Sequence, residues 1–183
     1  MPDTGQAQII RNGAVVRDCW QVLRPAAEAP LGIGSLPAGP VIVPLAFWTA
    51  NADALLARGE AAPWIASHED PVALAPWIPR LGLIAVDFPK FTDGRGFSTA
   101  FLLRSRLGYQ GELRAIGDVL ADQLFFMRRV GFDAYAVRAD KDIHKALQVL
   151  TPFTDVYQGS FDNPVPAFRR HRRVGPEAGK AGS

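Results

Sequence analysis

The chain has 183 residues, 48% of them hydrophobic and 21% charged, which matches one globular domain of roughly 100–200 residues. This composition excludes intrinsic disorder, collagen and coiled coil as descriptions of the whole chain. A single cysteine excludes an intramolecular disulfide and is too few for a structural zinc site. Three histidines, far apart in the sequence, show no metal-ligand spacing, so we expect no metal.

The first residues lack the basic segment and apolar run of a signal peptide, and no stretch reaches the roughly 18 apolar residues of a membrane helix. We therefore expect a cytoplasmic protein without a membrane partner. The formal net charge of +2 is unevenly distributed, because residues 164–183 hold five basic side chains and one acid, which leaves −2 for the rest. We predict a flexible basic tail over 164–183, and the acidic body argues against nucleic-acid binding.

Two short β-type runs flank Asn12-Gly13, a strong two-residue hairpin signal, and predict an N-terminal hairpin over residues 8–24. In this interpretation Trp20 to Leu23 prolong the second strand, and Cys19 is a small buried side chain. Residues 25–40 are rich in proline and glycine without periodicity, which predicts an irregular connection to the main sheet.

From Val41 onward, short apolar runs alternate with stretches of helical apolar spacing. The predicted strands cover 41–47, 64–66, 83–86, 113–116 and 134–137. The predicted helices run from 49 or 51 to 59, over 98–107 and 119–130, and from 140 or 142 to 150, with a weaker, proline-interrupted segment around Leu74, Trp77 and Ile78. Such alternation is typical of a parallel sheet covered by helices.

We predict an α/β fold in which residues 1–163 form one domain: a mostly parallel sheet of five to six strands, with helices on both faces, preceded by the hairpin. An open doubly wound sheet and a truncated (β/α) barrel both fit. The open sheet is favoured because a closed eight-stranded barrel needs roughly 250 residues. If the strands are central and parallel, Val43, Ala85, Ala115 and Ala136 should be almost wholly buried.

Functional groups of either architecture gather beyond the carboxyl ends of the strands, and the segment 86–98 follows such an end. Lys90 and Arg95 can hold an anion there, together with the free N–H groups of a helix that begins near Ser98, and Asp93 and Ser98 are further ligand-binding candidates. A purely structural interpretation is equally open. In that interpretation Asp93 begins a turn, Ser98 caps the helix, and the phenylalanines of the segment anchor it to the core.

Two further acidic residues follow neighbouring predicted strands. If those strands are adjacent, Asp87 and Asp118 face one crevice and are candidates for acid–base catalysis, with Arg138 beside them. The structural alternatives are that Asp118 caps a helix and that Arg138 forms an ion pair with one of these aspartates. The sequence has no GxxxxGK[ST], GxGxxG or CxxC motif, so no cofactor is evident.

Several blocks of this sequence resemble the bacterial family designated domain of unknown function 934. The resemblance extends from the hairpin to about Arg170, and its most specific block is DFPKFTDGRG at 87–96. The other blocks are IIRNG at 9–13, VIVPL at 41–45, GELRAIGDV at 111–119 with DQ at 122–123, and GFDA at 131–134.

Members of that family are encoded beside assimilatory sulfite reductase genes, and some are labelled oxidoreductases. The resemblance therefore implies an accessory or partner protein of sulfate and sulfite reduction, with sulfite reductase or another sulfate-assimilation protein as the partner. Any redox cofactor would come from that partner. The alternative is a small stand-alone enzyme acting on an anionic metabolite, held by Lys90 and Arg95. The sequence does not decide between a binding protein and an enzyme.

Overall fold

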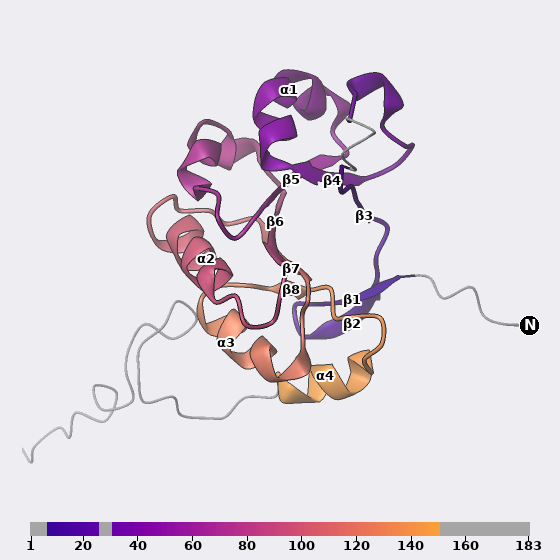
Figure 1. Cartoon of the computed structure of the whole chain (residues 1–183), viewed down its shortest axis with the longest axis vertical. Coiled ribbons are helices and arrows are strands. Elements are labelled where there is room, and N and C mark those ends of the chain that lie inside the picture. The colour runs from indigo at the N-terminus through magenta and orange to yellow at the C-terminus, as the bar shows by residue number, and fades with distance from the viewer. Residues whose placement is uncertain (1–6, 26–30, 151–183) are drawn as a thin grey trace, which may run out of the picture.

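The fold is built on one β-sheet (Figure 1). The computed structural model describes residues 7–25 and 31–150. Its eight strands lie in the order β2-β1-β8-β7-β6-β5-β4-β3. Strands β3 to β8 are parallel and follow one another in chain order, whereas β1 is antiparallel to β2 and β8. The bounds are β1 (Gln8–Arg11), β2 (Ala14–Arg17), β3 (Gln21–Val22), β4 (Val41–Pro44), β5 (Ala61–Ile65), β6 (Leu83–Phe88), β7 (Glu112–Gly117) and β8 (Ala134–Tyr135).

The two outer strands of this sheet, β2 and β3, are consecutive in the chain. Only residues 18–20, here called the strap, separate them, and four peptide steps span at most about 14 Å. The two edges of the sheet therefore approach each other, and the sheet is curled into a half-barrel. Figure 1 shows the chain running between β2 and β3 on the side of the sheet away from α2 and α3. The turn at Asn12-Gly13 is confirmed, with φ of 50° and 78°.

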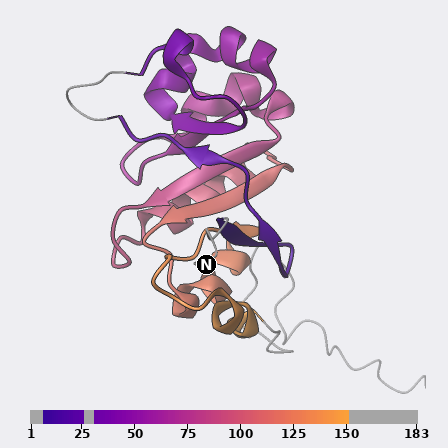
Figure 2. The ribbon, with the colours of Figure 1, turned by 90° about the vertical axis from the view of Figure 1, so that its right-hand side faces the viewer.

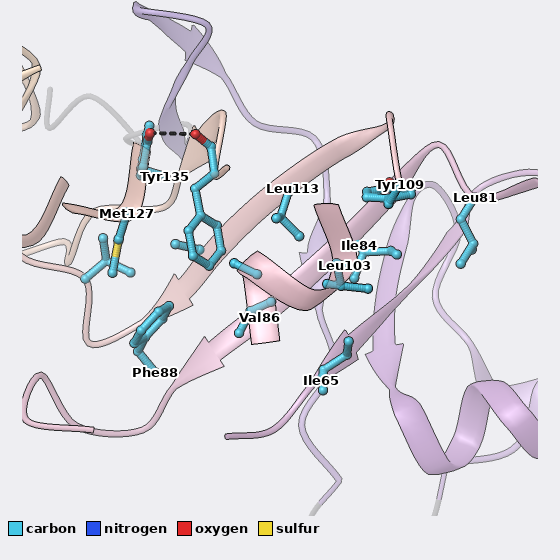
Figure 3. Packing of buried hydrophobic residues seen from close by; sticks show 14 of the residues in the cluster. Ile65, Leu81, Ile84, Val86, Phe88, Leu103, Tyr109, Leu113, Met127 and Tyr135 are labelled. Atoms are coloured by element: carbon cyan, nitrogen blue, oxygen red, sulfur yellow. Dashed lines mark hydrogen bonds between the residues drawn. The ribbon is translucent and has the colours of Figure 1, made fainter. Parts of the chain in front are cut away.

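The helices pack on one face of the sheet. They are α1 (Leu45–Arg58), α2 (Arg95–Ser105), α3 (Leu124–Arg129) and α4 (Ile143–Val149), joined by the 3-10 segments η1 (Ile33–Ser35), η2 (Pro71–Arg80) and η3 (Ala121–Gln123). Trp48, Leu103, Met127 and Ala146, one from each helix in turn, belong to a single buried cluster that also includes Val86 of β6. Figure 3 shows Leu103 and Met127 lying against the strands in this cluster.

The opposite face of the sheet carries a smaller core. Ile42, Ala62, Leu83, Ala85 and Ile116 form it, and Trp20 of the strap packs against them. Figure 2 shows β3 and the segment that joins it to β2 on this side of the sheet. The strap therefore takes the place that a second layer of helices would occupy.

The strand order corrects two predictions. A doubly wound sheet has a point where the strand order reverses, but β3 to β8 are strictly sequential, so the order is that of a partial (β/α) barrel. Helices on both faces are wrong for the same reason, because right-handed crossovers between strands added in one direction place every helix on one face. The α/β class and the mostly parallel character of the sheet are confirmed, but the sheet has eight strands rather than five to six, because β3 and the hairpin strands β1 and β2 are part of it.

The predicted burial of the central strands is largely confirmed. Val43, Ala85 and Ala115 are 0% exposed. Ala136 is only half-buried, because β8 ends one residue before it. Trp20 to Leu23 do not prolong the hairpin, since β3 pairs with β4 at the far edge, and Cys19 is exposed rather than buried.

Helix boundaries differ from the predicted ones at the amino ends. Helix α1 begins at Leu45, directly after β4, so Thr49 and Asn51 lie within it. Gly59 ends α1 in the left-handed conformation, with φ of 75°. The segment expected at 119–130 is split into η3 and α3, and Asp142 caps α4 by accepting hydrogen bonds from two backbone N–H groups. No helix in the described part of the chain has the length and apolarity needed to cross a membrane.

Candidate functional site

The predicted site residues lie where strands β3 to β8 end, which we call the carboxyl edge. Asp87 is the last but one residue of β6, and Asp118 follows β7, its neighbour in the sheet. Arg138 follows β8, the next strand, and its backbone N–H donates to the carbonyl oxygen of Val119. Parallel pairing therefore brings the three residues to one edge, as the sequence predicted.

Asp87 is paired with an arginine that the sequence analysis did not single out. Its carboxylate accepts a hydrogen bond of 3.1 Å from Nη1 of Arg24 and a second bond from Nη2. The Asp87 side chain is 7% exposed and that of Arg24 is 49% exposed. The Arg24 guanidinium also lies over the ring of Trp64, 5.2 Å from its centroid. Hydrogen bonding to Asp87 raises the pKa of Arg24, so the guanidinium stays charged.

An ion pair between two neighbouring residues stabilises the end of the loop after β6. The carboxylate of Asp93 accepts hydrogen bonds from Nε and Nη2 of Arg95, at 2.9 and 2.7 Å, and from the Arg95 backbone N–H. Hydrogen bonds from Arg95 and then from the Ser67 hydroxyl hold the pKa of Asp93 well below its usual range. Helix α2 begins at Arg95, so Ser98 does not cap it and lies within its first turns. Asp93 thus occupies the first free N–H at the helix start, where the sequence analysis placed an anion.

Asp118 does not cap a helix, which corrects the structural alternative for this residue. One carboxylate oxygen accepts a hydrogen bond of 2.8 Å from the backbone N–H of Phe91, and the other accepts one of 2.9 Å from Nη1 of Arg138. The carbonyl oxygen of Phe91 accepts a bond of 2.6 Å from Nε2 of Gln123. Both backbone groups of Phe91 are therefore held by side chains that follow β7.

Arg138 joins two carboxylates. Besides Asp118, it binds Asp140 through Nε and Nη2, at 2.8 and 2.9 Å. Hydrogen bonding to Arg138, followed by that from the Phe91 N–H, lowers the pKa of Asp118, and Arg138 likewise lowers the pKa of Asp140. The predicted ion pair between Arg138 and one of the two candidate aspartates is confirmed.

Asp87 and Asp118 consequently lie at the same edge but serve different partners. Between them, Gly117 has φ of +91°, and a Cβ there would lie 2.6 Å from Oδ1 of Asp87. Only glycine fits this close approach. Each of the two carboxylates has its own cationic partner. The edge therefore does not present them as an acid–base pair that shares one substrate.

The tip of the loop after β6, which includes Lys90 and Phe91, is exposed to solvent. Phe91 is 53% exposed, and Lys90 is exposed and forms no ion pair with any described residue. The other phenylalanines of this segment are core anchors, since Phe88 is 0% exposed and contacts Phe97 edge-on at 5.5 Å. Gly96 allows this packing, because a Cβ there would lie 2.6 Å from the Phe88 ring.

A second charged network lies on the strap side of the sheet and was not predicted. Arg114 of β7 is 1% exposed, and its guanidinium binds Asp18 of the strap at 2.9 Å and Glu112 at 2.7 Å. Its satisfied hydrogen bonds and its position away from the carboxyl edge make it an anchor for the strap. Arg24 and Asp18 were both missed because β3 was assigned to the hairpin. With that assignment, the chain was not expected to cross the sheet between β2 and β3.

Two hollows of the described surface lie away from Asp87, Asp118 and Arg138, and Ser98 lines one of them. One of about 320 Å³ lies at the opposite edge beside Arg11, Trp20 and Glu112, and one of about 390 Å³ lies on α2. Within residues 7–25 and 31–150, no three His, Cys, Asp or Glu side chains cluster as metal ligands would.

Comparisons with known proteins identify the family. A search of curated proteins finds no match. The family model described as a bacterial protein of unknown function, DUF934, matches residues 62–168. This range holds the loop after β6, Asp118 and Arg138, while the hairpin, the strap and β4 precede it. Because the match covers more than half of the chain, the protein belongs to the DUF934 family.

Proposed function

We propose that this protein is an accessory protein of assimilatory sulfite reduction, which docks onto a partner through the tip of the loop after β6. The observation that carries the proposal is the state of Phe91, which is 53% exposed while Asp118 and Gln123 hold its backbone. An aromatic ring that is presented to water by a fixed backbone loses little conformational freedom when a partner covers it. Aromatic side chains in this situation are favoured anchors of protein interfaces.

Lys90 adds a charge preference to this tip. It is exposed, next to Phe91, and has no ion pair within the described residues, whereas Arg95 and Arg138 are already bound to aspartates. The complementary surface would therefore have an apolar pocket for the ring and an acidic group, or a small bound anion, facing Lys90. Of the cations expected to hold an anion, Lys90 alone therefore remains in this proposal.

Acid–base catalysis on an anionic metabolite receives less support from the same geometry. Both oxygens of Asp87 accept hydrogen bonds from Arg24. The lowered pKa of Asp118 keeps this carboxylate ionised and makes it a weak proton acceptor at neutral pH. A binding role needs no titrating group, so it fits the arginine-held carboxylates better than catalysis does.

The choice of partner rests on the resemblance to a family whose members are encoded beside assimilatory sulfite reductase genes. The test is to tag the full chain, grow its bacterial host on sulfate as sole sulfur source, and identify what co-purifies. We expect sulfite reductase or another sulfate-assimilation protein to be enriched with the unaltered chain and lost with Phe91→Ser. Turnover of a sulfur metabolite by the purified chain alone, with no enriched partner, would contradict the proposal and favour the enzyme alternative.

A further inference from the structure

A hollow of about 320 Å³ lies at the amino edge of the sheet, where β5, β6 and β7 begin, and thus at the edge opposite the proposed docking tip. The strap, the end of β1, the last turn of α1 and the end of η2 complete its wall. Ligand pockets in proteins have volumes of roughly 300–1,000 Å³, so this hollow has room for a small molecule. We call it the amino-edge pocket.

One part of the lining of this pocket is apolar and aromatic. Leu55 and Leu83 are 1% and 4% exposed, and Trp20 of the strap is half-buried. The strap is fixed in place, because Asp18 pairs with the buried Arg114 at 2.9 Å and accepts a hydrogen bond of 3.2 Å from the Trp20 backbone N–H. An indole ring on a fixed backbone can pack against the apolar or planar part of a ligand without first being ordered.

Two arginines line the same pocket. Arg80, the last residue of η2, is exposed, and its side chain forms no hydrogen bond or ion pair with the residues that the structure describes. Arg11 is 46% exposed, and its Nη1 lies 3.6 Å from Oε2 of Glu112. That distance is too long for a hydrogen bond, so both guanidinium groups keep N–H donors that a ligand can use.

The acidic side chain in the lining is already neutralised. Glu112 is 17% exposed, and its Oε1 lies 2.7 Å from Nη2 of Arg114. For the charged residues of the lining and their ion-pair partners, Arg11, Arg80 and Arg114 stand against Asp18 and Glu112, which leaves one positive charge. The charge balance of the pocket therefore favours a ligand with one negative charge.

We infer that the amino-edge pocket binds a small organic anion, with its carboxylate or sulfonate group toward Arg11 and Arg80 and its apolar or planar part against Trp20. Guanidinium groups match the oxygens of such anions through charge-assisted hydrogen bonds. The role is binding rather than catalysis, because catalytic groups of (β/α) folds gather at the carboxyl edge and no serine, cysteine or histidine lines this pocket. This inference does not depend on the proposed docking function.

Titration of the isotope-labelled full chain with three probes, followed by NMR, tests the site. The probes are benzoate, benzenesulfonate and the uncharged benzamide, and the signals are the backbone amides of Gly59 and Gly82, which line the pocket. We expect at least one of the two anions to shift these signals saturably, with a Kd on the order of 1 mM, as is usual for ligands of so few atoms. Benzamide has the shape of benzoate without its charge, so it should bind at least about tenfold more weakly.

Two matched variants assign the binding to the pocket. Arg80→Gln removes the cation that has no partner among the described residues, and should weaken binding of the anion at least about fivefold. Arg106→Gln makes the same change at an exposed arginine outside the lining, and should stay within about twofold. The absence of a saturable shift with either anion, equal binding of benzamide, or equal affinities of the two variants would overturn the inference.

Discussion

The carboxylate of Asp118 accepts a hydrogen bond of 2.8 Å from the backbone N–H of Phe91, so a residue that follows β7 fixes the loop that follows β6. Arg138, after β8, binds the other oxygen of the same carboxylate at 2.9 Å. Three successive parallel strands are thus tied together at their carboxyl ends by one aspartate. These hydrogen bonds fix the backbone of Phe91, whose side chain is exposed. Asp118 therefore links strand ends and does not cap a helix.

The first prediction concerns this tie. Asp118→Ala removes the acceptor for the Phe91 N–H, so hydrogen exchange of a peptide covering residues 89–93 should become faster, while exchange of β6 stays slow. The control is Asp122→Ala, because Asp122 is exposed on the neighbouring 3-10 segment and should leave exchange of the loop unchanged. Unchanged exchange in the Asp118 variant would show that the carboxylate does not hold the loop.

The second prediction separates the two glycines of the loop and α2. A Cβ at Gly96 would lie 2.6 Å from the buried ring of Phe88, whereas one at Gly94 meets nothing within 4 Å, and Gly94 has an ordinary φ of −76°. Gly96→Ala should therefore lower the free energy of unfolding by about 1–3 kcal/mol. Gly94→Ala should change it by less than about 0.5 kcal/mol. Urea unfolding of both variants measures the difference, and similar values would refute the close packing of α2 on β6.

The third prediction tests the pair of Arg24 and Asp87. Arg24→Ala leaves a carboxylate with a 7% exposed side chain without its cation, and should cost about 1–3 kcal/mol of unfolding free energy. The cost stays below the 3–5 kcal/mol of a fully buried pair because Arg24 is half exposed and water can enter its place.

A double-mutant cycle provides the control for that pair. Asp87→Asn in the Arg24→Ala background removes the unpaired charge, so the double variant should be more stable than the sum of the single effects, with a coupling energy of about 0.5–3 kcal/mol. Strictly additive losses would mean that the two side chains do not interact in solution.

The fourth prediction is a loss of stability in acid. Asp93, Asp118, Asp140 and Asp142 all have lowered pKa values, each through hydrogen bonds to arginines or backbone N–H groups. The unfolded chain then binds protons on these groups more readily than the folded protein does. Their contribution is present above the ordinary aspartate pKa of about 3.9 and is lost as the pH falls below it.

Asp133 contributes in the opposite sense. Burial raises its pKa, so protonation relieves the cost of its buried charge as the pH falls toward 4. Urea unfolding between pH 7 and pH 3 should show the steepest loss below about pH 4, and Asp118→Asn should reduce that loss. A stability that is unchanged from pH 5 to pH 3 would contradict the ionised carboxyl edge.

Much of the sheet could be predicted because its strands are apolar and short. The apolar runs that begin at Val41 and Leu83 follow a proline or a glycine and alternate with stretches of helical spacing, which predicts parallel strands. Strand order is a different matter. It depends on which edge each new strand joins, and two-residue strands such as β3 carry almost no periodic signal. The sheet curls into a half-barrel because the short strap joins its two edge strands. In the sequence, the three residues of the strap look like the end of a hairpin, so the curl was not predicted.

The position of the candidate site and the pairing of Arg138 with an aspartate were predicted, but the other partners of these residues were not. The rule that functional groups follow strand ends brought Asp87, Asp118 and Arg138 to one edge, and parallel pairing placed them there. Their partners come from elsewhere: Arg24 precedes Asp87 by 63 residues, and Gln123 binds a backbone group of Phe91. Such long-range pairs leave no local pattern. The same rule applied after β3 would have singled out Arg24 if β3 had been recognised as a strand of the parallel sheet.

The most direct test of the docking proposal is the affinity of the purified chain for purified sulfite reductase. The comparison covers the unaltered protein, Phe91→Ser and Val72→Ser, whose exposed side chain is 55% accessible but lies on η2. We predict that Phe91→Ser weakens binding about 30-fold, as expected for loss of an aromatic anchor worth about 2 kcal/mol, and that Val72→Ser stays within about twofold. Equal affinity for all three proteins, or no binding by the unaltered chain, would contradict a docking role for the loop after β6.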